Sequence, residues 1–592
     1  MIQRCFNISG IALPALLLFV AMLAGCATPQ SSSLAGADSK AAAVAPADTP
    51  QGQAQLHQET PDFPVRSFPT ETLYDLLVAE LAGMENNLPL ALSNYLLQAR
   101  ETRDPGIVAR AARIAAYAEN HPALLEMSLL WSEIEPDNLN ARSVATLSLG
   151  REGRLTEALQ HAEFALTRGD QEPIMSLTVS AGGASTEQRQ SLLDAYTELL
   201  TRSPTDEAVL LTYAMLLRQQ GQFLPALATI DELLEQAPAK ESAIMLKAQL
   251  LHQLGKKQVA TQFLGSVLGD LADSKRLRLQ YARFLAEDDL HGAYQQLNTL
   301  LEQYPHDAEL AFTLALVCRG LNKNQEAKQL YTQLSQNPNM AAAAHFELGQ
   351  LAEEEDNSDA VLLHYRAVRN GPKFLPAVVK LGRFMARNDQ LGNAQLYMSQ
   401  LRLEYPHYSA HLYQIESELL VENQMLGDAH LILSEALDHF PNNISLLYSR
   451  SILSERQNDF ASSEQDLRAI LAQDANNSMA LNALGYTLTL HTERYEEARQ
   501  LIMRALELNP GDPAIIDSLG WVLFQQGEYD AAITHLREAL EKMPDPEIAA
   551  HLGEALWVNG QQEEALQVWQ QILEQYPDNH IILDTMQRLQ AE

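Results

Sequence analysis

The sequence of 592 residues predicts an all-α fold, a superhelical solenoid of about 15 helix-turn-helix units behind a flexible tether. Three observations predict it. Proline, or a residue in its place, recurs at intervals of about 34 residues. Apolar residues within each interval are spaced three and four apart, which is typical of one buried helix face. The chain also opens with a short apolar segment that ends at a cysteine, followed by a stretch of low apolar content.

Length and composition exclude several classes of protein for this chain. A single compact core rarely serves so long a chain, so several domains or a repeat array are expected. The 46% hydrophobic content excludes general disorder. The formal net charge of −35 opposes nucleic-acid binding, which needs a basic surface. The acidity is explained either by solubility or by a preference for basic protein partners.

Residues 1–25 have the features of an export signal. Arg4 precedes an apolar run from Ile8 to Leu23 that is short for a membrane-spanning helix. The segment that ends this run, Leu23-Ala24-Gly25-Cys26, resembles the lipobox of bacterial lipoproteins. The resemblance implies cleavage before Cys26, lipidation (palmitate included) of that cysteine and, with Ala27 next, anchoring to the periplasmic face of the outer membrane. An ordinary signal peptide with a chance cysteine is the alternative.

Residues 26–66 are then the lipidated cysteine and a tether rich in Ala, Ser, Gln, Pro and Gly, with no helical apolar stripe. Cys318 is the one cysteine left after processing and lipidation, so no intramolecular disulfide is expected. Its apolar neighbours predict a buried structural thiol.

The repeat begins after the tether and continues almost to the last residue. Within one unit, Gly520 and Ala532 are predicted to lie where two antiparallel helices cross, because small side chains let the axes approach. Gly527 is predicted in the turn at positive φ, and Pro544 after the second helix. The positions that mark the period are Pro105, Pro136, Asp170, Pro204, Pro238, Leu271, Pro305, Pro338, Pro372, Pro406, Pro441, Ala475, Pro510, Pro544 and Pro577.

This pattern resembles the tetratricopeptide repeat over residues 69–592. We expect degenerate helical repeats over 67–204 and regular ones over 205–592. The segment Ala181-Gly182-Gly183-Ala184-Ser185 interrupts one unit, whose helices are expected to be shortened or offset.

No motif for chemistry is present in the sequence. There is no HExxH zinc pair, GxSxG elbow or set of CxxC pairs, and the glycine-rich segment at 182–186 lacks the lysine of a phosphate loop. We therefore expect no catalytic residues, no metal ligands and no cofactor.

In tetratricopeptide repeats the first helix of each unit lines the concave face. Alignment on the Leu-Gly pairs then gives a candidate partner-binding set of Tyr486, Asp517, Trp521, Phe524 and Trp557, with Asn482 and Glu554 beside them. Aromatic anchors suit protein binding, but the same rings also suit filling gaps between repeats, and both interpretations stay open. Arg383 and Arg387, flanked by Glu418 and Glu422, either clamp a partner carboxylate or form an inter-repeat salt bridge, which we favour.

A lipobox, a tether and many repeats together resemble the adaptor lipoproteins of carboxyl-terminal processing proteases. The resemblance implies a non-catalytic periplasmic scaffold that binds a protease and its protein substrates, cell-wall hydrolases, besides the lipid bilayer. The alternative is an assembly or secretion scaffold for pili, secretion machinery or exported polysaccharide. A rival of a different class is an enzyme such as a peptidoglycan hydrolase, for which the sequence offers no residues.

Overall fold

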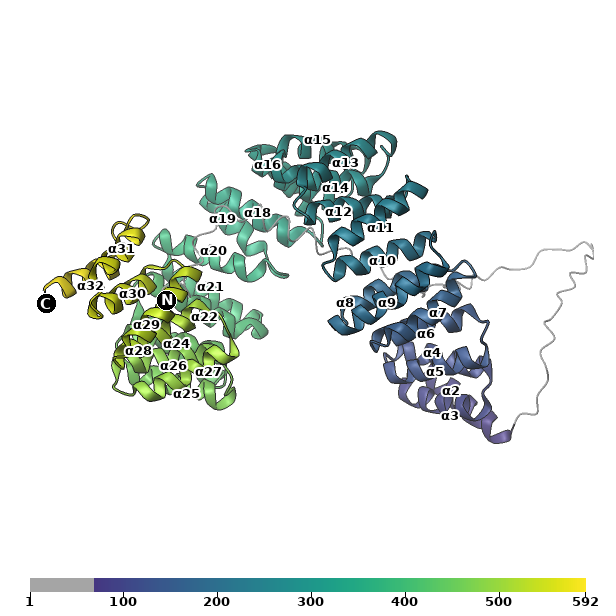
Figure 1. The fold of residues 1–592 in the computed structure, drawn as a ribbon, viewed down its shortest axis with the longest axis horizontal. Coiled ribbons are helices and arrows are strands. Elements are labelled where there is room, and N and C mark those ends of the chain that lie inside the picture. The colour runs from purple at the N-terminus through teal and green to yellow at the C-terminus, as the bar shows by residue number, and fades with distance from the viewer. Residues whose placement is uncertain (1–68, 592) are drawn as a thin grey trace, which may run out of the picture. The chain divides into compact units, whose positions relative to one another are not determined.

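A computed structural model describes residues 69–591, which are helical almost throughout (Figure 1). They contain 31 α-helices and one short 3-10 helix, so the predicted all-helical solenoid of about 15 helix pairs is confirmed. The predicted signal peptide, Cys26 and the tether lie outside these residues. Within 69–591 no helix combines the length and apolar character needed to cross a membrane.

The described residues divide into two compact units at the junction between Leu321 and Asn322. The first unit, purple to teal in Figure 1, contains the helices α2 (Thr70–Met84), α3 (Leu88–Thr102), α4 (Pro105–Tyr117), α5 (His121–Ile134), α6 (Leu139–Arg151), α7 (Leu155–Leu166), α8 (Glu172–Gly182), α9 (Thr186–Arg202), α10 (Glu207–Gln219), α11 (Phe223–Gln236), α12 (Glu241–Gln253), α13 (Lys257–Asp270), α14 (Lys275–Asp288), α15 (Leu290–Gln303) and α16 (Ala308–Gly320).

The second unit, teal-green to yellow in Figure 1, carries the candidate site. It contains α17 (Asn324–Leu334), α18 (Ala341–Glu354), α19 (Ser358–Ala367), α20 (Phe374–Arg387), α21 (Leu391–Glu404), η2 (Pro406–Tyr408), α22 (Ser409–Glu422), α23 (Leu426–His439), α24 (Ile444–Arg456), α25 (Phe460–Gln473), α26 (Ser478–His491), α27 (Tyr495–Leu508), α28 (Pro513–Gln525), α29 (Tyr529–Lys542), α30 (Pro546–Val558), α31 (Gln562–Leu573) and α32 (His580–Ala591).

Local sequence explains where these helices begin and end. The side chains of Asn477 and Asp512 accept hydrogen bonds from backbone N–H groups in the first turns of α26 and α28, at 3.0 and 2.9 Å. Such caps satisfy donors that a helix start leaves free. At the other end, α29 stops at Lys542, two residues before Pro544, as predicted from the periodic proline.

Glycine sets the distance between the two helices of a unit. A Cβ added to Gly520 would lie 2.6 Å from Cγ of Leu536, so the predicted close approach of α28 and α29 is confirmed. The partner differs from the prediction, because the atoms nearest that position belong to Leu536, one turn beyond the buried Ala532. Gly527 has a φ of +80°, as expected for the turn.

The irregular unit at residues 171–204 contains two helices of unequal length. Its first helix, α8, has 11 residues and ends at Gly182, whereas its second, α9, has 17. Ser185 caps α9 by accepting from the backbone N–H of Gln188, whose side chain in turn accepts from the Ser185 N–H. The first helix is therefore shortened as predicted, whereas the second is not, and the glycine-rich segment forms the end of α8 and the turn that leads to the Ser185 cap of α9.

The hydrophobic core of each unit runs along the stack rather than forming one centre, because every helix pair covers the open apolar face of its neighbour. Cys318 is 0% exposed within this packing, as the sequence predicted.

Candidate functional site

A continuous row of side chains runs along the second unit. It comes from the first helices of consecutive pairs, which are α24, α26, α28 and α30. α26 contacts α28, and α28 contacts α30. The Tyr486 hydroxyl on α26 donates a 2.8 Å hydrogen bond to Glu547 at the start of α30, two repeats away. Side chains two repeats apart meet only on the inside of a curve. We call this face of α24, α26, α28 and α30 the inner face.

A polar and aromatic cluster lies at the centre of the inner face. Nδ1 of His551 lies 3.0 and 3.1 Å from the two carboxylate oxygens of Asp517, across neighbouring repeats. The Trp521 ring stacks on His551 at a centroid distance of 4.1 Å and on Phe524 at 4.8 Å. The indole is therefore held between an imidazole and a second aromatic ring.

The charge pair in this cluster has a defined protonation preference. Burial lowers the pKa of His551, but the Asp517 carboxylate more than offsets this effect and leaves the pKa above its ordinary value. His551 is therefore protonated further into the neutral range than a free histidine.

A second acidic group extends the inner face towards α24. Burial, followed by the nearby charge of Glu547, raises the pKa of Glu455 to about 7. Its Oε1 lies 3.8 Å from Nε2 of His491, whose own pKa burial lowers, so the imidazole gives little charge compensation. At the other end, Glu554 pairs with Arg588 at 2.6 Å.

Burial separates the two interpretations left open for the predicted aromatic residues. Tyr486 and Trp521 are each 7% exposed and Asp517 is 1% exposed, so for these three side chains the structure favours the interpretation that they fill gaps between repeats. Phe524 and Trp557 are half-buried and present part of their rings at the surface. A partner-binding role for the set stays a prediction.

Only one of the two predicted arginines forms the expected contact with an acidic side chain. Nε of Arg383 lies 3.0 Å from each carboxylate oxygen of Glu422, which is the inter-repeat salt bridge that we favoured. Arg387 is exposed and takes no part in it. Burial and the neighbouring Glu422 charge raise the pKa of Glu418 to about 7, against the opposing effect of Arg383. The crevice beside Arg383, Glu418 and Glu422 has a volume of about 10 Å³, which is about enough for one water molecule.

Sequence reasoning missed His551, Glu547 and Glu455. His551 follows Asp517 by 34 residues, and Arg588 follows Glu554 by the same interval. A search for opposite charges one period apart on the first helices would therefore have predicted both the Asp517–His551 and the Glu554–Arg588 pair. No group of three or more metal-ligating side chains lies together among residues 69–591.

Comparison with known proteins identifies the repeat. Models of the tetratricopeptide repeat match residues 476–545 and 518–580, which together cover the inner face from α26 to α30. The TPR repeat-containing protein PA4667 of Pseudomonas aeruginosa is 40% identical over 480 residues, which are 81% of this chain and 81% of that protein.

Two solved structures match shorter stretches of this chain. A thermophilic TPR protein of Thermus thermophilus is 22% identical over 31% of this chain and 97% of its own, with a TM-score of 0.28. MamA from Desulfovibrio magneticus RS-1 is 20% identical over 29% of this chain and 97% of its own, with a TM-score of 0.26.

The helix pairs, their period and the inner face define a scaffold for protein–protein interactions, because tetratricopeptide domains bind proteins. The chain belongs to the family of tetratricopeptide repeat-containing proteins that includes PA4667.

Proposed function

We propose that the chain is a non-catalytic scaffold, tethered to the periplasmic face of the outer membrane through Cys26, that holds protein partners on the inner face of its second unit. The single observation that carries this proposal is the cluster at the centre of that face. Phe524 in this cluster is half-buried beside Trp521, and Trp557 on the next first helix is half-buried beside Trp569. Such half-open aromatic residues give a large contact area at a small entropic cost.

The chemistry of the inner face defines the partner. Glu455, Asp517 and Glu547 make the surroundings acidic, with His551 as the cation among them. A basic polypeptide segment with an apolar or aromatic side chain fits this combination best.

The finer role in our proposal is that of an adaptor for a carboxyl-terminal processing protease. One surface would hold the protease and another its cell-wall hydrolase substrate, and the gain in local concentration would promote cleavage without any chemistry by the scaffold. Support comes from the resemblance of the lipobox, tether and repeats to such adaptors.

The test is an affinity capture of the full lipidated chain from detergent-solubilised envelope, beside Phe524→Ala and Trp557→Ala variants. A processing protease and a hydrolase that bind the wild type and are lost from both variants support the proposal. Pilus, secretion or polysaccharide-export components in their place would replace the adaptor with an assembly scaffold. Hydrolysis of isolated sacculi by the purified chain would overturn the non-catalytic role.

The matched control is Tyr117→Ala on α4, because this aromatic side chain is 74% exposed and lies in the other unit. It should capture the same proteins as the wild type. Loss of partners from the control would show that any exposed ring recruits them, which contradicts a role for the inner face.

A further inference from the structure

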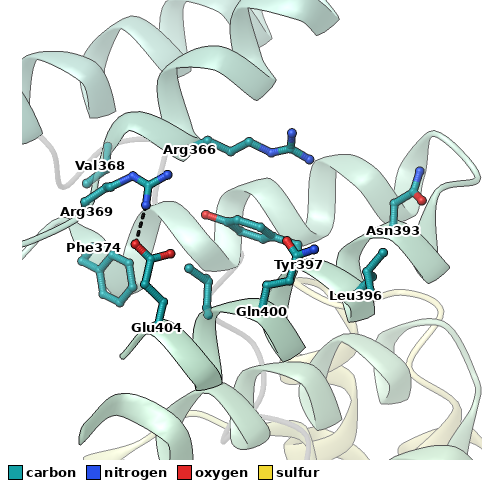
Figure 2. A pocket seen from close by; sticks show the side chains of 10 residues that line it. Arg366, Val368, Arg369, Phe374, Asn393, Leu396, Tyr397, Gln400 and Glu404 are labelled. Carbon is teal, nitrogen blue, oxygen red and sulfur yellow. Dashed lines mark hydrogen bonds and ion pairs between the residues drawn. The ribbon is translucent and has the colours of Figure 1, made fainter. Parts of the chain in front are cut away.

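A cavity of about 500 Å³ lies on the second-helix side of the second unit (Figure 2), and none of its lining residues belongs to the inner-face cluster. It is lined by α19 and α21, by the link between α19 and α20, and by the first residue of α20. Its volume is in the range of small-ligand and peptide sites.

The cavity exists because α19 ends early. α19 has 10 residues and stops at Ala367, while its counterpart in the next pair, α21, has 14. Gly371 has a φ of +72° and precedes Pro372, so the chain turns through a non-helical link instead of completing the last turn. Phe374, which begins α20, packs against Tyr405 and Tyr408 at centroid distances of 4.9 and 5.2 Å and forms a rigid wall.

Two arginines enter the cavity, but only one is neutralised. Arg369 donates to Glu404 at 2.6 Å. Arg366 lies over the ring of Tyr397, with its guanidinium carbon 5.5 Å from the ring centroid, and forms no ion pair with any described residue (Figure 2).

The neighbours of Arg366 suit one carboxylate. The side-chain amides of Asn393 and Gln400 also line the cavity and can donate hydrogen bonds. A guanidinium binds a carboxylate through two parallel hydrogen bonds. Glu404 in the same wall opposes a second negative charge, which disfavours a phosphate dianion.

The surface around the mouth indicates a polypeptide rather than a small free acid. Leu396 lines the cavity and is 59% exposed. Leu363 on α19 and Leu403 on α21, each one helical turn from the lining residues Arg366 and Gln400, are 63% and 83% exposed. Leu396, Gln400 and Leu403 follow a spacing of four and three along α21 and therefore share one face. Apolar side chains beside a charged cavity add contact area for residues that flank a carboxylate.

We propose that this cavity binds a single carboxylate presented by a polypeptide, with Arg366 as its ligand and the leucines around the mouth holding the adjacent apolar side chain. The carboxylate comes from an acidic side chain or from a chain terminus. This site is separate from the inner face and does not depend on the function proposed above.

The test uses three capped peptides as probes with the full chain in detergent, and saturation-transfer NMR of the peptides as the readout. The probes are N-acetyl-Leu-Glu-amide, N-acetyl-Leu-Gln-amide and N-acetyl-Leu-Gln with a free terminus. We expect binding of the first, of the third or of both, and none of the neutral second peptide. Binding of the first alone assigns the site to acidic side chains, and binding of the third alone assigns it to chain termini. Equal binding of all three, or of none at millimolar concentration, would overturn the proposal.

Variants identify the site. Arg366→Gln should weaken the acidic probe about tenfold or more. Glu404→Gln should strengthen it several-fold, because it removes a repulsive charge and releases Arg369, an effect that loss of fold does not produce. Arg113→Gln, at an exposed arginine on α4, is the matched control and should leave binding unchanged. Unchanged affinity in Arg366→Gln with an unchanged melting temperature would contradict the assignment.

Discussion

The hydroxyl of Tyr486 donates to a carboxylate oxygen of Glu547 at 2.8 Å, although 61 residues and one intervening repeat separate them in the chain. This hydrogen bond bridges α26 and α30 over the helix between them. The curvature of the array and the closeness of its inner-face residues are therefore coupled, since a straighter stack would separate the two groups.

Removal of that hydroxyl tests the coupling. Tyr486→Phe keeps the ring and should lower the free energy of unfolding by about 1 kcal/mol, the usual net value of such a hydrogen bond. The measurement is chemical denaturation followed by circular dichroism. A Tyr95→Phe variant, which removes a hydroxyl bound to Glu80 between adjacent helices, is a suitable comparison, and solution scattering should show a change in shape only for Tyr486→Phe.

The pair formed by His551 and Asp517 predicts a pH dependence of stability. The folded pKa of His551 is raised, so its contribution is fully present below the unfolded pKa of about 6.5 and is lost as pH rises through the folded pKa. The free energy of unfolding of the wild type should therefore decrease as pH rises from 6.5 to alkaline values. The decrease should be larger than the one measured for His551→Gln over the same range. Parallel melting curves of the two proteins over this range would contradict the assignment.

Glu455 predicts a second dependence at lower pH. Its folded pKa of about 7 exceeds the ordinary value of 4.5, so the folded state holds a proton that the unfolded state releases between these values. Stability falls as pH rises through that interval, by an amount on the order of 3 kcal/mol at most. Glu455→Gln should raise the melting temperature at pH 8 but not at pH 4. A gain that is equal at both pH values would assign the effect to something other than protonation.

The helix crossing at Gly520 predicts intolerance of even one methyl group. Gly520→Ala places a carbon within 2.6 Å of Leu536 Cγ and should cost about 1–3 kcal/mol through overpacking. Gly269→Ala on α13 is the control, since nothing among the described residues lies within 4 Å of its added carbon. Thermal unfolding should show destabilisation for the first variant and a neutral or small stabilising effect for the second. An equal change in melting temperature for both variants would contradict a close crossing of α28 and α29 at Gly520.

The helix pairs could be predicted from the sequence because each period repeats the same local constraints. Pro544 stops a helix, Gly527 takes the positive φ of a turn, and Gly520 brings two axes together, each within one unit. The partner of Gly520 could not be predicted, because Ala532 and Leu536 lie on the same face of α29 and only the crossing geometry selects the latter.

The candidate site was less predictable because burial depends on neighbouring repeats. Trp521 and Phe524 are one turn apart on α28, yet Trp521 is covered by His551 from the next pair and Phe524 is only half-buried. Arg383 forms the salt bridge with Glu422 that its sequence neighbours predicted, whereas Arg387 is exposed and takes no part in it. The contact between Tyr486 and Glu547 spans two periods, so no comparison of adjacent units reveals it.

The most direct test of the central claim, that the inner face holds protein partners, is site-specific photo-crosslinking in intact cells. A benzophenone side chain is introduced at Phe524 or Trp557 on the inner face, or at Tyr117 as the exposed control. The account predicts discrete protein adducts at the two inner-face positions and none of the same adducts at Tyr117. Adducts from Tyr117 alone, or an identical set from all three positions, would contradict it.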